Sequence, residues 1–193
     1  MKGRIRIIIA VIVFIGIVIG GYITYKADLD KKSIENVYSA DCVLLYSKNM
    51  SHSTLQYYID SVAKVYSHNK SVLMQEADTK KQLKEIQVYI EYGTNVVIAD
   101  NCFSEAIYWA QAYYPDVNFI LLDSVPSCSN DYVLQANCVS ICDKSNIDLK
   151  SVSKIESVTI DELNDNKQGV LLQQLVKCKE GDFNGSKIYL YNR

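Results

Sequence analysis

Short apolar runs alternate with amphipathic stretches along residues 40–143, and this alternation constrains the fold more than any other feature of the 193-residue sequence. Continuous apolar runs a few residues long are typical of strands buried on both faces of a sheet. Between them, apolar residues recur every three or four positions, as in helices with one buried face. Strands that alternate with such helices form βαβ units. We therefore expect an α/β domain with a Rossmann-like, doubly wound, mainly parallel sheet.

The expected elements can be placed by residue number. The strands are 42–46 (CVLLY), 71–74, 95–99 (NVVIA), 118–122 (NFILL) and one strand within 132–141, and the helices begin at Ser51 or Ser53, at Asp78 and at Ser104. In the tail we expect a strand at 158–160, a helix from Asp161 or Asp165 to about Lys179, and a strand at 187–191 (KIYLY). Ligands of doubly wound sheets bind beyond the carboxyl ends of the strands, so the segments that follow the strands are the candidate sites.

An uncharged apolar run, residues 7–23, lies near the N-terminus. As a helix, its 17 residues span about 26 Å, enough for the hydrocarbon core of a bilayer. Lys2, Arg4 and Arg6 precede it, which favours an N-terminus in the cytoplasm. We predict a membrane anchor over 1–26, a stalk or short helix over 27–39, and an extracytoplasmic domain over 40–193. That domain has a core at 40–143 and a C-terminal segment at 144–193.

Two other leader types compete with an uncleaved anchor. A signal peptide needs small residues around its cleavage site, and residues 22–27 (YITYKA) make a poor one. A lipoprotein needs a cysteine directly after the apolar run, whereas the first cysteine is Cys42. A cell-membrane protein with a single pass is therefore the prediction.

The charge balance argues against nucleic acid as a partner. Residues 1–26 carry four basic and no acidic side chains, and the remaining chain carries 16 basic and 22 acidic ones. Nucleic-acid phosphates attract a basic surface, which an acidic domain does not provide.

Residues 93–126 resemble the basic membrane protein family of ABC-importer substrate-binding proteins, which includes purine-nucleoside receptors. The resemblance is carried by a glycine, a strand, a helix ending in residues 112–119 (AYYPDVNF), and a strand ending in Leu122-Asp123. Residues 131–141 and 178–191 (CKEGDFNGSKIYLY) are similar to later family segments. Members have two lobes of the type I periplasmic-binding-protein fold, and the resemblance covers about one lobe.

The resemblance implies a small polar ligand of the nucleoside kind, bound at the strand ends. Its expected contacts are Asn49, Ser51, His52, Asp100, Asn101 and Asp123. His52 takes the place of an aromatic residue that stacks on the base. The implied partners are an ABC transporter permease or a second copy of the chain that closes the cleft. No cofactor is implied.

The same residues also have purely structural interpretations. Ser51 is a suitable helix N-cap beside an exposed His52, and Asp100-Asn101 suits a turn and cap before the next helix. Asp123 suits a turn before Pro126. A chain that keeps only these roles is a single-lobe regulatory or structural interaction module without a ligand.

Enzymatic and metal-dependent functions find little support. The six cysteines form no CxxC pair, and only His52 and His68 are available as imidazole ligands, so we predict no metal site. No P-loop, GxGxxG or GxSxG motif is present. A bridge from Cys128 to Cys138 or Cys142 stays open beside reduced, buried thiols. We therefore predict a binding protein without catalytic residues.

Overall fold

The computed structural model describes residues 2–74, 78–129, 131–146, 159–162, 175 and 187–191, without the side chains of residues 2–18 and 146. The chain divides into two compact units, Met1–Ser39 and Ala40–Arg193.

The first unit is the helix α1, Lys2–Tyr38. The predicted stalk is thus a continuation of this helix, since the sequence from residue 22 to residue 38 contains neither proline nor glycine. Within the described part of the chain, no helix combines the length and apolar character needed to cross a bilayer. Most of the predicted anchor, residues 1–26, lies outside the described side chains.

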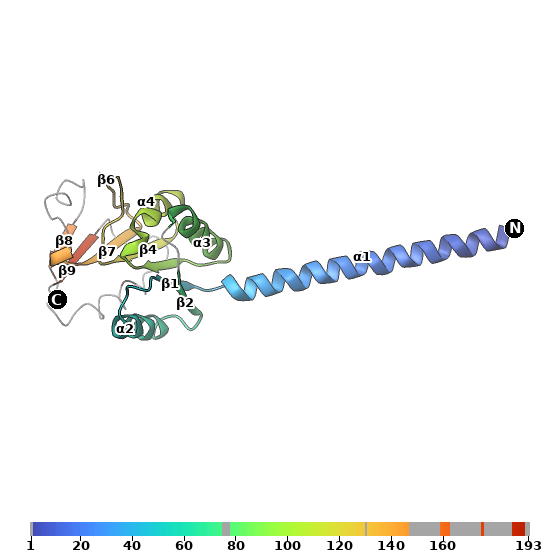
Figure 1. The fold of residues 1–193 in the computed structure, drawn as a ribbon, viewed down its shortest axis with the longest axis horizontal. Helices are drawn as coiled ribbons and strands as arrows, with labels where there is room; N and C mark the ends of the chain where they lie inside the picture. The colour runs from blue at the N-terminus through green and yellow to red at the C-terminus, as the bar shows by residue number, and fades with distance from the viewer. Residues whose placement is uncertain are drawn as a thin grey trace. The chain divides into compact units, whose positions relative to one another are not determined.

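The second unit is built on a seven-stranded sheet in which every pairing is parallel (Figure 1). Its strands are β1 (Cys42–Tyr46), β2 (Asn69–Leu73), β3 (Val96–Ala99), β4 (Asn118–Leu122), β7 (Cys138–Asp143), β8 (Thr159–Glu162) and β9 (Lys187–Tyr191). Their order is β2-β1-β3-β4-β7-β9-β8. The parallel α/β prediction is confirmed.

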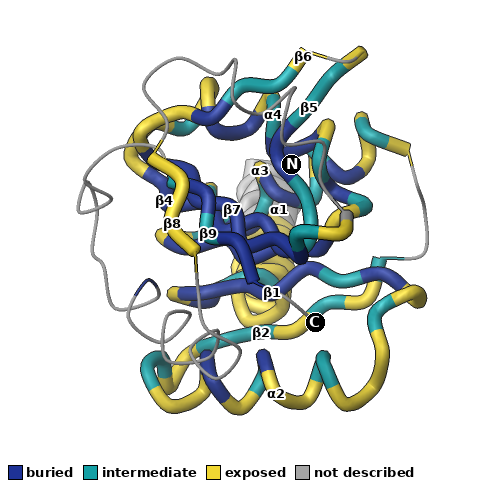
Figure 2. Tube along the Cα trace, turned by 90° about the vertical axis from the view of Figure 1, so that its left-hand side faces the viewer, coloured by how far each residue is buried: buried dark blue, intermediate teal, exposed yellow. Residues whose placement is uncertain are grey.

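Helices cover both faces of this sheet. They are α2 (His52–Ala63), α3 (Thr79–Glu91) and α4 (Ser104–Tyr113), with short 3₁₀ turns η1 (Asn101–Phe103) and η2 (Lys144–Asn146). Figure 2 shows α2 on one side of the buried strands, and α3 and α4 on the other. Both faces are covered because β1, β3, β4 and β7 are apolar or buried at nearly every position.

The core follows the strand pleat. Alternate strand residues such as Leu44, Ile98 and Ile120 form one cluster with Tyr58 and Val62 of α2. The residues between them point to the opposite face because side chains alternate along a strand. The sheet edges are more polar: β2 is only partly buried, and β8 (TIDE) is exposed throughout. Charged, exposed edge strands discourage pairing with further chains.

The strand predicted within 132–141 is β7, which begins at Cys138 and continues two residues beyond that range, to Asp143. The Nδ2 atom of Asn137 donates to the carbonyls of Gln111, Tyr114 and Val117 at 3.2, 3.0 and 2.9 Å, which holds the residue before β7 against the end of α4. A two-stranded antiparallel hairpin, β5 (Ser127–Cys128) and β6 (Asp131–Tyr132), precedes it and was not predicted. Most of the predicted C-terminal helix lies outside the described residues.

The strand order creates a crevice at one place. The chain passes from β1 outward to β2 and then returns to β3 on the other side of β1. Helices that follow β1 and β3 therefore diverge to opposite faces, and ligands of such sheets bind at this topological switch point.

Candidate functional site

A cavity of about 200 Å³ lies at the carboxyl ends of β1, β3 and β4. It is lined by Asn49, Met50, Ser51, Thr54, Asp100, Asn101 and Asp123. The structure thus brings together five of the six predicted contact residues, from three separate loops. Whether they bind a ligand stays a prediction.

Asp100 is a buried residue of the cavity lining, with 4% of its surface exposed. Its Oδ2 accepts hydrogen bonds from the backbone N and the Oγ of Ser47, both at 2.6 Å. Its Oδ1 accepts one from the backbone N of Cys102 at 3.1 Å and so caps η1. Asp100 therefore joins the ends of β1 and β3, and much of its hydrogen-bonding capacity is used within the chain.

The loop after β1 positions the next side chains. The Oγ of Ser47 accepts from the backbone N of Asn49 at 3.3 Å, which continues the chain of hydrogen bonds from Asp100. Ser51 is the N-cap of α2 and accepts from the backbone N of Thr54 at 3.2 Å, so the capping interpretation is confirmed. His52 is the exposed first residue of α2 and is not among the residues that line the cavity.

Asp123 is held at the other side of the cavity by distant parts of the chain. Its backbone has φ of 56°, in the left-handed region that aspartate tolerates better than most residues. Its backbone N donates to the Ile141 carbonyl at 2.7 Å, and its Oδ1 accepts a hydrogen bond from the hydroxyl of Tyr191, the last residue of β9. The C-terminal strand therefore orients a residue of the cavity.

Four participants are not among the predicted contact residues: Ser47, Met50, Thr54 and Tyr191. Ser47 directly follows an apolar run, as Asp100 and Asp123 do, so its position was a usable signal. Tyr191 lies 68 residues from its partner, and no local pattern indicates that contact.

The cavity is suited to a ligand that donates hydrogen bonds. Two carboxylates, two amides and two hydroxyls line it, and no basic side chain is among these lining residues. Among the described residues, no group of three histidine, cysteine, aspartate or glutamate side chains is arranged to hold a metal ion. The arrangement supports recognition of a polar molecule by its hydroxyl or amino groups.

Five described cysteines, Cys42, Cys102, Cys128, Cys138 and Cys142, are free thiols, and Cys178 lies outside the described residues. Burial raises the pKa of the Cys42 and Cys138 thiols. Burial raises the pKa of Cys102 to about 12, with a contribution from the neighbouring Asp100. Burial also raises the pKa of Cys142 to about 12, and the negative charge of Asp123 contributes to this increase.

These pKa values predict slow alkylation. At about pH 8, iodoacetamide is expected to modify Cys102 and Cys142 at least about a hundred-fold more slowly in the folded chain than in urea, because only the thiolate reacts. Peptide mapping by mass spectrometry after timed quenching measures each site. The rates should rise as the pH increases from about 9 toward about 12, the interval between the ordinary pKa and the raised one. Equal rates with and without urea would contradict the assigned burial.

No family model and no curated protein matches the chain. Among solved structures, it is similar to a fragment of a candidate lipoprotein from Peptoclostridium difficile 630, at 13% identity and a TM-score of 0.41 over 70% of this chain and 95% of that one. It is also similar to an ABC transporter system solute-binding protein from Aeropyrum pernix K1, at 10% identity and a TM-score of 0.39 over 79% of this chain. A third is a transcriptional activator of the comK gene from Bacillus halodurans, at 13% identity and a TM-score of 0.41 over 77% of this chain.

This chain spans 48% of the Aeropyrum protein and 53% of the Bacillus protein, about half the length of each. At these TM-scores the similarities assign neither a family nor a ligand, and the resemblance to the basic membrane protein family stays a prediction.

Proposed function

We propose that this chain is a membrane-anchored, extracytoplasmic binding domain that recognises a small polar ligand, a nucleoside or a similar molecule, for an ABC importer. The observation that carries the proposal is the cavity at the β1–β3 switch point, where Asn49, Ser51, Asp100, Asn101 and Asp123 meet. Loops at a switch point are the ordinary ligand site of a doubly wound sheet.

The lining chemistry supports a ligand rich in hydroxyl or amino groups. Asp123 presents a carboxylate, and the side chains of Asn49 and Asn101 are exposed at the cavity. Carboxylates accept hydrogen bonds and amides do both, so they pair with the hydroxyl groups of a sugar.

The volume of the cavity indicates that it forms only part of a complete binding site. Pockets for drug-sized ligands occupy about 300–1,000 Å³, whereas this cavity holds about 200 Å³. It therefore covers one part of a nucleoside, and a second surface must cover the rest. A second copy of this chain or the transporter's permease is the proposed source of that surface.

The apolar run 7–23, with basic residues before it, supports attachment to the cell membrane. We also propose binding without chemical conversion. The buried Ser47 hydroxyl is hydrogen-bonded to Asp100 and not to a histidine, so its partner is not the imidazole base that activates a serine nucleophile.

Thermal unfolding of the full chain in mild detergent, followed by the fluorescence of its single tryptophan, tests the proposal. Ribose and a panel of nucleosides are titrated to millimolar concentration. A ligand at about a hundred times its Kd stabilises the folded state by about 2.7 kcal/mol, so Tm should rise with concentration. Asp123→Asn and Asn101→Ala should each reduce the rise.

Asp116→Asn is the matched control. It removes one negative charge, as Asp123→Asn does, but from the exposed turn before β4, at the amino end of that strand and not at the carboxyl ends that form the cavity. It should leave the ligand effect unchanged. His52→Ala tests whether His52 reaches a ligand from outside the cavity. If no member of the panel changes Tm, the proposal fails.

The second candidate is a single-lobe regulatory or structural interaction module without a ligand. The specific observation in its favour is that both carboxylate oxygens of Asp100 accept hydrogen bonds from Ser47 and Cys102. Absence of any ligand effect, together with a Tm that Asp123→Asn still lowers relative to the Asp116→Asn control, would favour this candidate, because Asp123 then has only its structural contact with Tyr191.

A further inference from the structure

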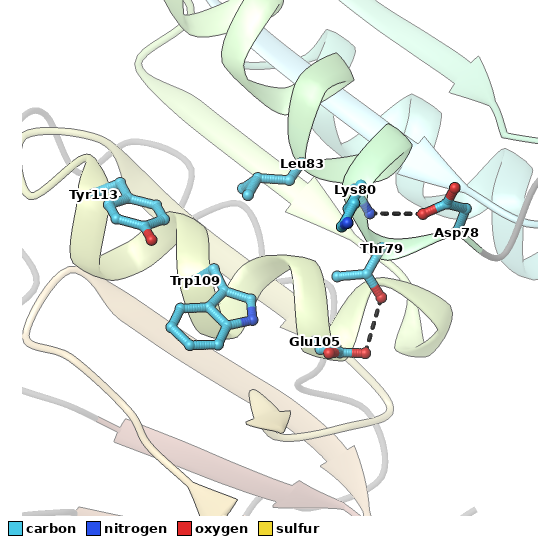
Figure 3. Close-up of a pocket in the computed structure, with 7 residues that line it drawn as sticks. All are labelled: Asp78, Thr79, Lys80, Leu83, Glu105, Trp109 and Tyr113. Carbon is cyan, nitrogen blue, oxygen red and sulfur yellow. Dashed lines mark hydrogen bonds between the residues drawn. The ribbon is translucent and has the colours of Figure 1, made fainter. Parts of the chain in front are cut away.

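A second hollow lies away from the cavity at the strand ends, between α3 and α4. It has a volume of about 580 Å³, within the range of about 300–1,000 Å³ for small-molecule pockets. It is lined by Asp78, Thr79, Lys80, Leu83, Glu105, Trp109 and Tyr113 (Figure 3). None of these residues belongs to the site proposed above.

One stripe of α4 forms the wall of this α3–α4 groove. Glu105, Trp109 and Tyr113 are spaced four residues apart, so they follow one another along the same side of the helix. The Trp109 and Tyr113 rings stack with centroids 6.5 Å apart and an interplanar angle of 19°. Trp109 is 39% exposed and Tyr113 is 63% exposed, so the stacked pair forms a contiguous exposed aromatic surface, which is more informative than a single exposed side chain.

The carboxylate beside these rings is fixed in place. The Oε2 of Glu105 accepts a hydrogen bond from the Oγ1 of Thr79 at 2.8 Å, and its Oε1 accepts one from the Cys128 thiol at 3.6 Å. Three elements therefore hold Glu105: α4 itself, the start of α3 and the hairpin strand β5. Figure 3 shows Glu105 and Tyr113 on either side of Trp109, with Leu83 extending from α3 toward the aromatic rings.

The charges around the groove select the ligand chemistry. Glu105 and Asp78 contribute two carboxylates, and Lys80 at the start of α3 contributes one ammonium group. Aromatic faces attract cations through their quadrupole, and a nearby carboxylate attracts the same cation through its own negative charge. We propose that the α3–α4 groove binds a small organic cation of the quaternary-ammonium class, with its charge over Trp109 beside Glu105 and its apolar part against Tyr113 and Leu83.

Trp109 reports on this site directly because it is the only tryptophan of the chain. Choline and tetraethylammonium are titrated into the full chain while its fluorescence is followed, in parallel with 3,3-dimethyl-1-butanol, a neutral molecule of the shape of choline. We expect saturable changes at millimolar concentration for the cations, and at least about fivefold weaker binding of the neutral molecule. The comparison uses the unmodified chain, so it does not depend on any variant folding.

Substitutions then test which side chains of the groove interact with the positive charge of choline. Glu105→Gln keeps an oxygen for Thr79 and should weaken choline binding about tenfold, while Tyr113→Ala should weaken it about fivefold. Lys80→Gln should strengthen it about twofold because it removes the like charge. The matched control is Glu91→Gln, an exposed glutamate at the last position of α3, which should leave binding unchanged.

Several results would overturn the proposal. They are equal binding of the neutral molecule, binding that Glu105→Gln leaves unchanged, and a linear fluorescence response without saturation. If a second copy of the chain covers the groove, Trp109 fluorescence should change with protein concentration and should not change when the cations are added. This result too would overturn the proposal. Nucleoside binding at the strand ends is measured separately, so either proposal can fail alone.

Discussion

Replacing Phe119 with alanine is expected to lower the free energy of unfolding by about 3–5 kcal/mol. Phe119 is fully buried on β4, at the middle of the seven-stranded sheet. It is paired with Val97 of β3 on one side and Cys138 of β7 on the other. Truncation removes a large apolar side chain and leaves a cavity that neighbouring strands cannot fill.

Urea unfolding, followed by circular dichroism and by Trp109 fluorescence, measures this loss. Phe119→Leu is the matched control, since it keeps most of the volume and should cost about 1–1.5 kcal/mol. Because small domains have only about 5–15 kcal/mol of stability in total, the alanine variant should unfold at a much lower urea concentration. A loss below about 1 kcal/mol would mean that β4 is not a central strand.

Replacing Asp100 with alanine is expected to lower the free energy of unfolding by about 3 kcal/mol. The substitution removes the acceptor of three hydrogen bonds, from Ser47 N, Ser47 Oγ and Cys102 N. Ser47 is itself buried, so its donors lose their partner in a place where water does not easily replace it. The ends of β1 and β3 should then separate.

Asp100→Asn distinguishes the loss of acceptors from the loss of shape. Asparagine retains one oxygen, and about half of the destabilisation should remain. The same urea experiment measures both variants. If Asp100→Ala were as stable as the unmodified chain, Asp100 would not join the two strand ends. Because Asp100 supports the fold, Asp123 and Asn101 are the better positions at which to test ligand binding.

Much of the α/β unit could be predicted from local patterns. The strands at 42–46, 118–122 and 187–191 match the observed β1, β4 and β9 residue for residue, because short apolar runs bounded by polar residues mark buried strands. Ser51 and Asp78 are the observed N-caps of α2 and α3. Gly93 has φ of 100°, as expected for a residue that ends a helix in the left-handed region.

The rest could not be predicted because it depends on contacts between distant residues. The β5–β6 hairpin is only two residues long on each side, too short to carry a periodic pattern. The contact between Asp123 and Tyr191 exists because β9 lies next to β7, and nothing near either residue indicates that neighbour. Glu105 and Thr79 likewise meet only because α3 and α4 pack together.

The sequence by itself determined the parallel α/β class, the positions of most strands, and which polar residues follow them, because periodicity and capping act over a few residues. Only the tertiary structure decided that β9 lies between β7 and β8, that Ser47 and Cys102 occupy the Asp100 carboxylate, and that Trp109 and Glu105 face a groove beside α3. Strand order and side-chain partners depend on which distant surfaces pack best once the chain closes its loops, and no short window of sequence contains that information.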